Sequence, residues 1–384
     1  MSYFDHNATT PLSPAARAAW LKMADEAWHN PSSLYRAAAR ARIRLDSARE
    51  AIAALLGGEP AHYVFTSGAT EGAHAVLGRL AATLPADSRL AINPTEHPCV
   101  IAAAQRFFGD RILPLPVTAD GVVTAAAVET VLADPSVKTG AVVVMAANNE
   151  TGVIQPWREI ARACRAAAGG AGVPFVCDVT QWLGKLPGGG LGEAETGATL
   201  IASAHKFGGP KGVGFVKLPA DDPGFRLQPG GSQEHDHRGG TEDLPSIAAL
   251  VAALADAEQQ KVFLESDRLR IRDTAERALL AAVPGARIVG AGADRLWNTV
   301  SLLLPFGENT RWVTRLDKRD AQVSTGSACA TGKTGPSHVL TALGLSPDEA
   351  RRSLRISSGW ETTEADWQAL AAALAEVAAE LRQP

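Results

Sequence analysis

The chain has 384 residues, of which 46% are apolar and 20% are charged, and its net charge is −4. A chain of this length exceeds the size at which one hydrophobic core usually keeps growing, so two subdomains are expected. The slightly acidic balance predicts no general affinity for nucleic acid or for an anionic membrane. The longest strongly apolar run, at 141–147, is too short to cross a bilayer.

The N-terminus, "MSYFDHNATTPLSP", has no basic segment followed by an apolar one, so the sequence predicts no signal peptide and a cytoplasmic protein. The four cysteines, Cys99, Cys164, Cys177 and Cys329, are widely spaced and form no C-x-x-C pair. This spacing argues against a structural zinc site and against a disulfide scaffold. Five arginines at 35–49 lie on a predicted helix, which we interpret as a solvated face or subunit contact rather than an RNA-binding surface.

Short apolar runs alternate with alanine-rich, helix-compatible segments along the first two thirds of the chain. This alternation predicts a mostly parallel sheet that is covered by helices on both faces. The predicted strands lie within 62–66, 89–93, 112–117, 141–147, 174–179, 199–204 and 212–218. The predicted helices lie within 70–84, 97–108, 124–133 and 156–168. Ligands of such sheets bind beyond the carboxyl ends of the strands.

The pattern changes after about residue 245. A long helical stretch at 246–283 is followed by shorter apolar runs and by a final helix from Thr363 towards Leu381. We expect a large domain over 14–255 and a smaller α+β domain over 256–384 together with 1–13. The long helix would join the two.

Three loops that follow predicted strands carry residues with distinctive chemistry. "SGATEGAH" at 67–74 begins a helix, whose N–H groups and dipole favour an anion, and Thr70 adds a hydroxyl. Asp178 ends a buried strand, where a carboxylate needs a partner. Lys206 enters a glycine-rich loop and is the residue type that forms Schiff bases. Together these features match the phosphate, ring nitrogen and aldehyde of pyridoxal phosphate.

Cys329 lies among serine, threonine, glycine and alanine in "STGSACATG". Such neighbours offer little to bury, so this thiol is expected to be exposed and reactive on a movable loop. Cys164 and Cys177 have apolar neighbours and are expected in the core.

The chain resembles the cysteine desulfurase family (NifS/IscS type) among the fold-type I pyridoxal-phosphate enzymes related to class V aminotransferases. The similarity runs almost end to end through "DHNATTP", "HNPSS", "FTSGATE", "TEHPCV", "NNETGVIQP", "DVTQWLGKLP", "SAHKFGGPKGVG", "GGSQEHDHRGGTED", "STGSACATG" and "PSHVL". The resemblance implies an α/β fold with a mostly parallel seven-stranded sheet in the large domain and a smaller α+β C-terminal domain that carries the cysteine loop at about 324–336.

The resemblance also assigns roles to single residues around the cofactor ring. Lys206 would bind pyridoxal phosphate covalently, Asp178 would pair with its ring nitrogen, and His97 would stack on the ring and act in catalysis. Gln181 and Asn149 would lie near the phenolic oxygen.

At the two ends of the bound ligands, the family pattern implies a phosphate site and a substrate clamp. Arg355, with Asn149 nearby, would bind the substrate carboxylate, a task suited to its planar fork of donors. Thr241 would reach the phosphate of the neighbouring subunit, which implies a homodimer. The phosphate of the same subunit would be bound by Ala69, Thr70, Ser203 and His205.

The implied activity converts L-cysteine to L-alanine and leaves the sulfur as a persulfide on Cys329. A sulfur-acceptor or scaffold protein, for example in iron–sulfur cluster biosynthesis, would then receive it. A free thiol has a pKa of about 8.5, so Cys329 would need local activation. Gly335 and Trp360 depart from the family's usual glutamate and arginine, which bears on the acceptor and on the resting position of the loop.

Other interpretations fit parts of the sequence. An aminotransferase, a C–S lyase or a selenocysteine lyase could use the same scaffold, although a simple aminotransferase needs no loop thiol. "ATGKTG" resembles the end of a P-loop, but the first glycine of that pattern would have to stand at Ser327. His235 and His237 in "EHDH" could share a metal, yet an interface loop is favoured and no metal site is predicted.

Overall fold

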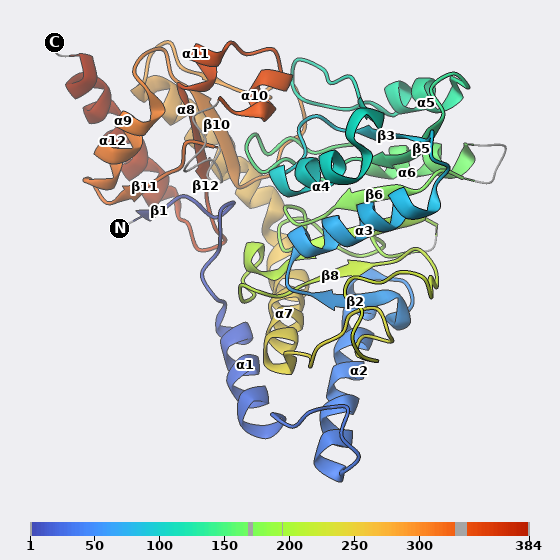
Figure 1. Cartoon of the computed structure of the whole chain (residues 1–384). Coiled ribbons are helices and arrows are strands. Elements are labelled where there is room, and N and C mark those ends of the chain that lie inside the picture. The colour runs from blue at the N-terminus through green and yellow to red at the C-terminus, as the bar shows by residue number, and fades with distance from the viewer. Residues whose placement is uncertain (1, 168–171, 194, 327–335, 383–384) are drawn as a thin grey trace.

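The computed structural model describes residues 2–167, 172–193, 195–326 and 336–382. Within this described part, seven strands form one sheet in the order β2-β8-β7-β6-β5-β3-β4 (Figure 1). β8 is antiparallel to both of its neighbours and the other pairs are parallel, which confirms the predicted mostly parallel sheet. The strands are β2 (Tyr63–Thr66), β3 (Arg89–Ile92), β4 (Ile112–Pro114), β5 (Thr139–Val143), β6 (Phe175–Asp178), β7 (Ala198–Ser203) and β8 (Gly214–Lys217).

The helices between these strands begin and end close to their predicted positions. They are α3 (Ala69–Thr83), α4 (Pro98–Phe108), α5 (Ala125–Ala133) and α6 (Trp157–Ala166). The start of α4 illustrates the local cause: His97 caps the helix by accepting the N–H of Cys99, and Pro98 occupies the first turn, where its missing N–H costs nothing.

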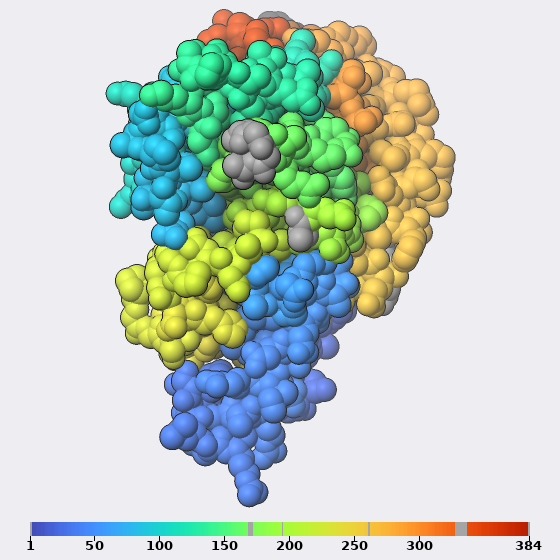
Figure 2. Space-filling model, turned by 90° about the vertical axis from the view of Figure 1, so that its right-hand side faces the viewer, coloured from blue at the N-terminus to red at the C-terminus, as the bar shows by residue number. Residues whose placement is uncertain are grey.

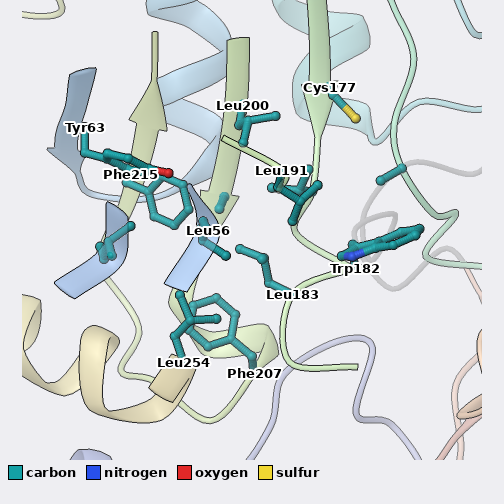
Figure 3. Close-up of a cluster of buried hydrophobic side chains, with 14 of the residues drawn as sticks. Leu56, Tyr63, Cys177, Trp182, Leu183, Leu191, Leu200, Phe207, Phe215 and Leu254 are labelled. Carbon is teal, nitrogen blue, oxygen red and sulfur yellow. The ribbon is translucent and has the colours of Figure 1, made fainter. Parts of the chain in front are cut away.

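Two hydrophobic cores cover the two faces of the large sheet. Along β5, Ala141 and Val143 pack into one core while Val142 packs into the other, because successive side chains of a strand point to opposite faces. Figure 3 shows part of the larger core, where Leu200 and Phe215 come from adjacent strands and Leu254 comes from a helix. Burial on both faces explains why the strands are almost continuously apolar in sequence.

The C-terminal part of the chain forms a smaller antiparallel sheet in the order β12-β10-β9. Phe4, from the other end of the chain, packs into the core beside it, and β1 pairs with β11. The proposed division into domains is consistent with this separate core but stays a prediction. The elements here are β1 (Ser2–Tyr3), β9 (Arg287–Ile288), β10 (Thr299–Leu303), α9 (Asn309–Asp317), β11 (Ala321–Gln322), α10 (His338–Ala342), α11 (Pro347–Ala350), β12 (Ser353–Ser357) and α12 (Glu364–Arg382).

The expectation of one long helix over 246–283 was wrong in detail. The chain forms α7 (Leu244–Asp256), then a π-helical turn at 257–261 and a 3-10 turn at 262–264, and then α8 (Glu265–Ala282). α7 buries Leu250 and Leu254 in the core of the large sheet, whereas α8 buries Ala275 and Leu279 in the C-terminal core. The two helices serve different cores, so the helical pattern changes between them.

Helices α1 (Pro14–Glu26) and α2 (Arg36–Leu56) project from one end of the molecule, where the N-terminal segments form a narrow tip (Figures 1 and 2). Large apolar side chains on these helices, between them and just before α1 are exposed, and we call this set the α1–α2 patch: Leu12, Trp20, Leu21, Trp28, Leu34, Tyr35 and Ile43. None of the helices in the described ranges is both long enough and apolar enough to span a membrane.

Candidate active site

A pocket of about 220 Å³ lies at the carboxyl ends of β6 and β7, next to the turn between β2 and α3. The chain order brings these loops together because parallel strands end at the same edge of the sheet. Nine residues that the sequence singled out as cofactor-binding line this one pocket: Ala69, Thr70, His97, Asn149, Asp178, Gln181, Ser203, His205 and Lys206. Their roles toward a cofactor are proposals that the geometry supports.

Lys206 reaches the pocket from a short 3-10 turn that follows β7. Its amine donates hydrogen bonds to two backbone carbonyl oxygens of the N-terminal segment, those of Asn7 and Ala8, each at 2.7 Å. The N-terminal segment therefore holds the Lys206 side chain in place. Asn7 and Lys206 are 199 positions apart in sequence.

Asp178 ends β6 and is only 5% exposed. Burial raises the pKa of its carboxyl group, while hydrogen bonds from Thr180 and the positive charge of Lys206 oppose that rise. Its Oδ1 accepts the backbone N–H of Thr180 at 2.8 Å. A cation on the pocket side, such as a protonated ring nitrogen, would favour the ionised carboxylate.

The N-terminus of α3 forms the opposite end of the pocket. Ala69 donates its N–H to the hydroxyl of Ser203 at 2.8 Å, and the helix dipole favours an anion at this end. Gly68 precedes the helix with a φ of 146°, and an added Cβ would come within 3.0 Å of the Ser203 oxygen. The hydroxyl groups of Thr70 and Ser203, which line the pocket here, and the helix dipole fit a phosphate group.

His97 is held in one orientation by the start of α4. Its Nδ1 accepts the backbone N–H of Cys99 at 3.2 Å and lies 3.0 Å from the Cys99 sulfur. Because the backbone N–H always donates, the ring proton must be on Nε2 when the ring is neutral. Burial lowers the pKa of His97 to about 4, and the charges of Lys206, His338 and Arg355 act in the same direction. The ring is therefore neutral near pH 7.

One buried oxygen atom in the pocket lining, Oδ1 of Asn149, has no hydrogen-bond partner among the residues that the structure describes. Buried polar atoms are nearly always hydrogen-bonded, so this oxygen indicates that the pocket receives a polar ligand. With the anion end and the buried carboxylate, the donor and acceptor set fits pyridoxal phosphate.

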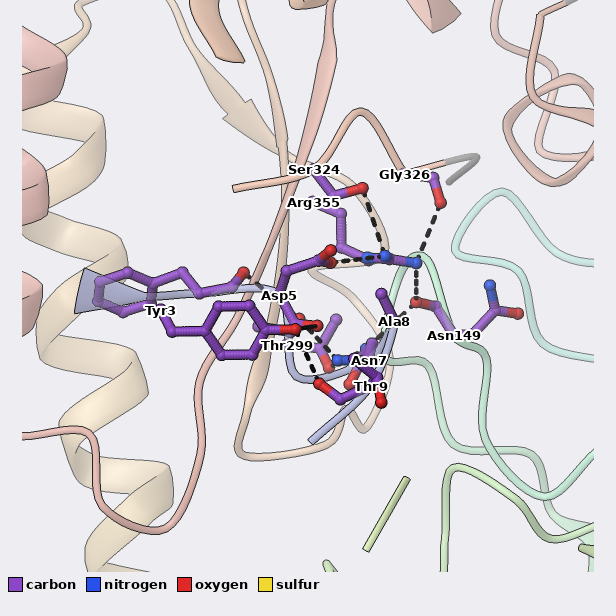
Figure 4. Close-up of polar contacts among 12 residues, drawn as sticks. Tyr3, Asp5, Asn7, Ala8, Thr9, Asn149, Thr299, Ser324, Gly326 and Arg355 are labelled. Carbon is purple, nitrogen blue, oxygen red and sulfur yellow. Dashed lines mark hydrogen bonds and ion pairs between the residues drawn. The ribbon is translucent and has the colours of Figure 1, made fainter. Parts of the chain in front are cut away.

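Arg355 lies on β12 beside the pocket and is 2% exposed (Figure 4). Its Nη2 donates to Oδ1 of Asp5 at 2.8 Å. Its Nη1 donates to the backbone oxygens of Gly326 at 3.0 Å and Asn149 at 3.2 Å. The guanidinium thus connects the N-terminal segment, the loop after β5 and the chain that leads to the cysteine loop.

Cys329, the predicted nucleophile, lies outside the described residues. The chain on either side of its segment is well anchored: Ser324 exchanges backbone hydrogen bonds with Arg355, and the hydroxyl of Ser337 donates to Glu150 at 2.6 Å. Glu150 is itself buried, at 3% exposure.

Thr241, the remaining predicted cofactor residue, is exposed and is not among the residues that line the pocket. The nearby loop that contains "EHDH" is held by a buried ion pair of 2.6 Å between Arg49 and Glu234. His237, which sequence reasoning considered as a metal ligand, has its Nδ1 2.8 Å from the backbone oxygen of Phe225.

Several residues that shape the site had no role assigned from the sequence. Asp5 and Asn7 stand in "DHNATTP", and Thr180 and Lys185 stand in "DVTQWLGKLP". In the sequence, only their closeness to residues with an assigned role could have pointed to them. Thr180, for example, stands two positions after Asp178. What each of them contacts depends on chain segments that are distant in sequence.

The comparisons agree with this geometry. The aminotransferase class-V family model matches residues 2–370. A cysteine desulfurase of Cereibacter sphaeroides is 37% identical over 99% of this chain and 96% of its own length. The chain belongs to the cysteine desulfurase family.

Other members of the cysteine desulfurase family show the same relationship. The IscS-like cysteine desulfurase of Mycobacterium tuberculosis is 36% identical over 95% of this chain and 93% of its own length. A solved NifS-like protein superposes with a TM-score of 0.86 at 29% identity and covers 99% of each chain. The predicted fold and the predicted family are therefore confirmed over nearly the whole length.

Proposed function

We propose that this member of the cysteine desulfurase family converts L-cysteine to L-alanine and carries the sulfur as a persulfide on Cys329. In the balanced reaction the C–S bond of L-cysteine breaks and an S–S bond to Cys329 forms, while the substrate β-carbon gains a proton. The observation that carries the proposal is the shared pocket of Lys206, Asp178 and His97 at the carboxyl edge of the sheet.

Pyridoxal phosphate, when bound, would supply an electron sink that weakens bonds at the Cα of the substrate. Lys206 would hold the cofactor and then, as an amine, move the Cα proton. Asp178 would keep the ring nitrogen protonated. His97, neutral and with its proton on Nε2, would stack on the ring without adding charge.

Arg355 would bind the substrate carboxylate, with the backbone of Asn149 beside it. Formation of the persulfide requires the thiol of Cys329 to reach the substrate sulfur. A sulfur carrier or an iron–sulfur scaffold protein as acceptor, and a cytoplasmic location, stay predictions.

A spectral and chemical experiment tests the proposal. The purified protein should absorb in the visible region after incubation with pyridoxal phosphate, and Lys206→Ala should lose that absorbance. Cys329→Ala should keep the absorbance but lose sulfide release and alanine formation from L-cysteine. Cys164→Ala serves as the matched control, because burial raises the pKa of the Cys164 thiol to about 12 and keeps it inert.

The outcome also separates the alternatives. A selenocysteine or C–S lyase would keep its full activity in Cys329→Ala, and an aminotransferase would convert its substrate without releasing sulfide. A wild-type protein that binds no pyridoxal phosphate would contradict the whole proposal.

A homodimer is proposed on the α1–α2 patch. Large exposed apolar clusters on a soluble protein are typical of interaction surfaces, and Trp28 and Leu34 are 71% and 103% exposed. In such a dimer, Thr241 of one copy would reach the phosphate site of the other copy. The double variant Trp28→Glu with Leu34→Glu should therefore sediment as a monomer, whereas Phe263→Glu, at an equally exposed position outside the patch, should stay dimeric. A wild-type monomer would contradict the proposal.

A further inference from the structure

Lys185 is a buried lysine that lies next to the active-site lysine and has no part in the function proposed above. It stands four residues after Gln181 and is 4% exposed. Its Nζ donates to Oε1 of Gln181 at 3.0 Å and lies 3.4 Å from the backbone oxygen of Lys206. A buried amino group is costly, so its position calls for an explanation.

The contacts of Gln181 with Lys185 and with Asn7 together decide which way its amide points. Burial and the nearby charge of Lys206 lower the pKa of Lys185 to about 7, but its amine carries N–H groups in either protonation state and donates one of them to the amide oxygen. The NH2 group is thereby turned to the other side, where it donates to the backbone oxygen of Asn7 at 3.0 Å. That same oxygen accepts the Lys206 amine at 2.7 Å.

The Gln181 NH2 group carries two hydrogens, of which Asn7 takes one. The second is available to the pocket, which Gln181 lines. Were the amide reversed, its oxygen would face both the Asn7 carbonyl and the pocket, and the hydrogen bond to Asn7 would be replaced by repulsion between two acceptors.

We propose that Lys185 is a positioning residue, which fixes Gln181 with its NH2 group toward the pocket so that Gln181 donates a hydrogen bond to the phenolic oxygen of the cofactor. The inference rests on the proposed function, because it requires pyridoxal phosphate in the pocket. It assigns to Lys185 a task in tuning the cofactor, exerted through Gln181 and without contact with the cofactor itself.

The expected signature is spectroscopic. A donor to the phenolic oxygen stabilises its unprotonated form and lowers the pH at which the proton shared with the bound lysine nitrogen is lost. In Lys185→Met, which removes the donor that orients Gln181, the pH midpoint of the cofactor absorbance should rise by about one unit, the equivalent of one hydrogen bond. The dissociation constant for pyridoxal phosphate should rise several-fold.

A double-mutant cycle separates orientation from charge. If Lys185 acts through Gln181, then Gln181→Leu alone should raise the midpoint similarly, and adding Lys185→Met to it should change the midpoint no further. If the full shift of Lys185→Met persists in the Gln181→Leu background, Lys185 acts by its charge and the inference is overturned. Should Lys185→Met fail to fold, Gln181→Leu still tests the inference, because an unshifted midpoint in that variant would overturn it.

Lys217→Met is the matched control. Lys217 is also buried, at 1% exposure, but lies on β8 near Glu193 and outside the pocket lining. Its replacement should leave the midpoint unchanged. A wild-type protein without visible absorbance would contradict the proposed function itself. A wild-type protein that titrates normally, together with an unshifted Lys185→Met, would overturn only the role of Lys185.

Discussion

The guanidinium of Arg355 already holds a carboxylate: Nη2 lies 2.8 Å from Oδ1 of Asp5, a residue 350 positions away in sequence (Figure 4). Arg355 is 2% exposed, so this ion pair satisfies a charge that water cannot reach. The Nε of Arg355 has no hydrogen-bond partner within the described part of the chain. A substrate carboxylate bound by Arg355 would therefore compete with Asp5 for this guanidinium.

Replacing Asp5 should change the response of the protein to ligand. Asp5→Asn leaves the buried guanidinium without its anionic partner, so the free protein should unfold at a lower temperature; breaking a buried pair costs about 3–5 kcal/mol. L-Alanine, which brings a carboxylate, should then raise the unfolding temperature of the variant more than that of the wild type. Thermal unfolding of the pyridoxal-phosphate-loaded proteins with and without L-alanine measures this, and equal shifts would contradict the competition between Asp5 and the ligand.

Replacing Arg355 should affect substrate binding more than turnover. Arg355→Lys keeps the charge but loses the planar fork, and a hydrogen bond to a charged group contributes about 1.5–3 kcal/mol. The KM for L-cysteine should rise by roughly 10- to 100-fold while kcat changes little. Arg352→Lys, three positions earlier and bonded to the backbone of Pro305, is the control and should keep the wild-type KM. A fall in kcat at constant KM would show that Arg355 does not clamp the substrate.

Buried histidines should make the apoprotein sensitive to acid. Burial lowers the pKa of His6 from 6.5 to about 4, and the charge of Lys185 acts in the same direction while that of Glu361 opposes it. Between these two pH values the unfolded chain binds a proton that the folded chain does not, so stability falls as the pH decreases through this window. His97 and His205 behave alike, each with a pKa of about 4.

The contribution of one histidine can be isolated by substitution. Between pH 6.5 and 4.5, His6→Gln should lose roughly 2 kcal/mol less stability than the wild type, because the glutamine does not titrate. Urea unfolding of the two apoproteins at several pH values measures the difference. Parallel pH profiles would mean that His6 is protonated in the folded protein.

The turn before α3 should tolerate only glycine. Gly68 has a φ of 146°, which side chains rarely adopt, and a methyl group there would press against Ser203. Gly68→Ala should weaken the binding of pyridoxal phosphate and of free phosphate by about tenfold, since this backbone strain costs of the order of 1–3 kcal/mol. Gly189→Ala, at a position where an added Cβ meets no other atom within 4 Å, should bind both ligands normally. Equal affinities would show that this turn does not hold the phosphate.

The sequence was sufficient for the large sheet and for most of the pocket. The strands are short and apolar, and helices follow β2, β3, β4 and β5, so local pattern determines most of the sheet; Asp178 ends β6, and Lys206 follows β7 after a short turn. Because the carboxyl ends of parallel strands share one edge of the sheet, the proximity of Asp178 and Lys206 also followed from the topology. The break between α7 and α8 could not be predicted from the sequence, because both halves are helical and only their packing on two different cores distinguishes them.

The contacts that complete the site were beyond local pattern. Asp5 meets Arg355, and Asn7 meets Lys206, across separations of 350 and 199 residues. A short N-terminal segment with no periodicity gives no indication of where it will lie. Lys185 was visible in the sequence only as one lysine among others, and its burial beside Gln181 depends on the fold around it.

The pairing of Asp5 with Arg355 has a consequence for biosynthesis. Asp5 leaves the ribosome 350 residues before Arg355 on β12. A nascent chain that has completed β8 contains every residue that lines the pocket but still lacks the arginine beside it. Such a chain could receive its cofactor while it is still being made, yet it would have no anchor for an amino acid until β12 was in place, which would keep an unfinished polypeptide from releasing sulfur.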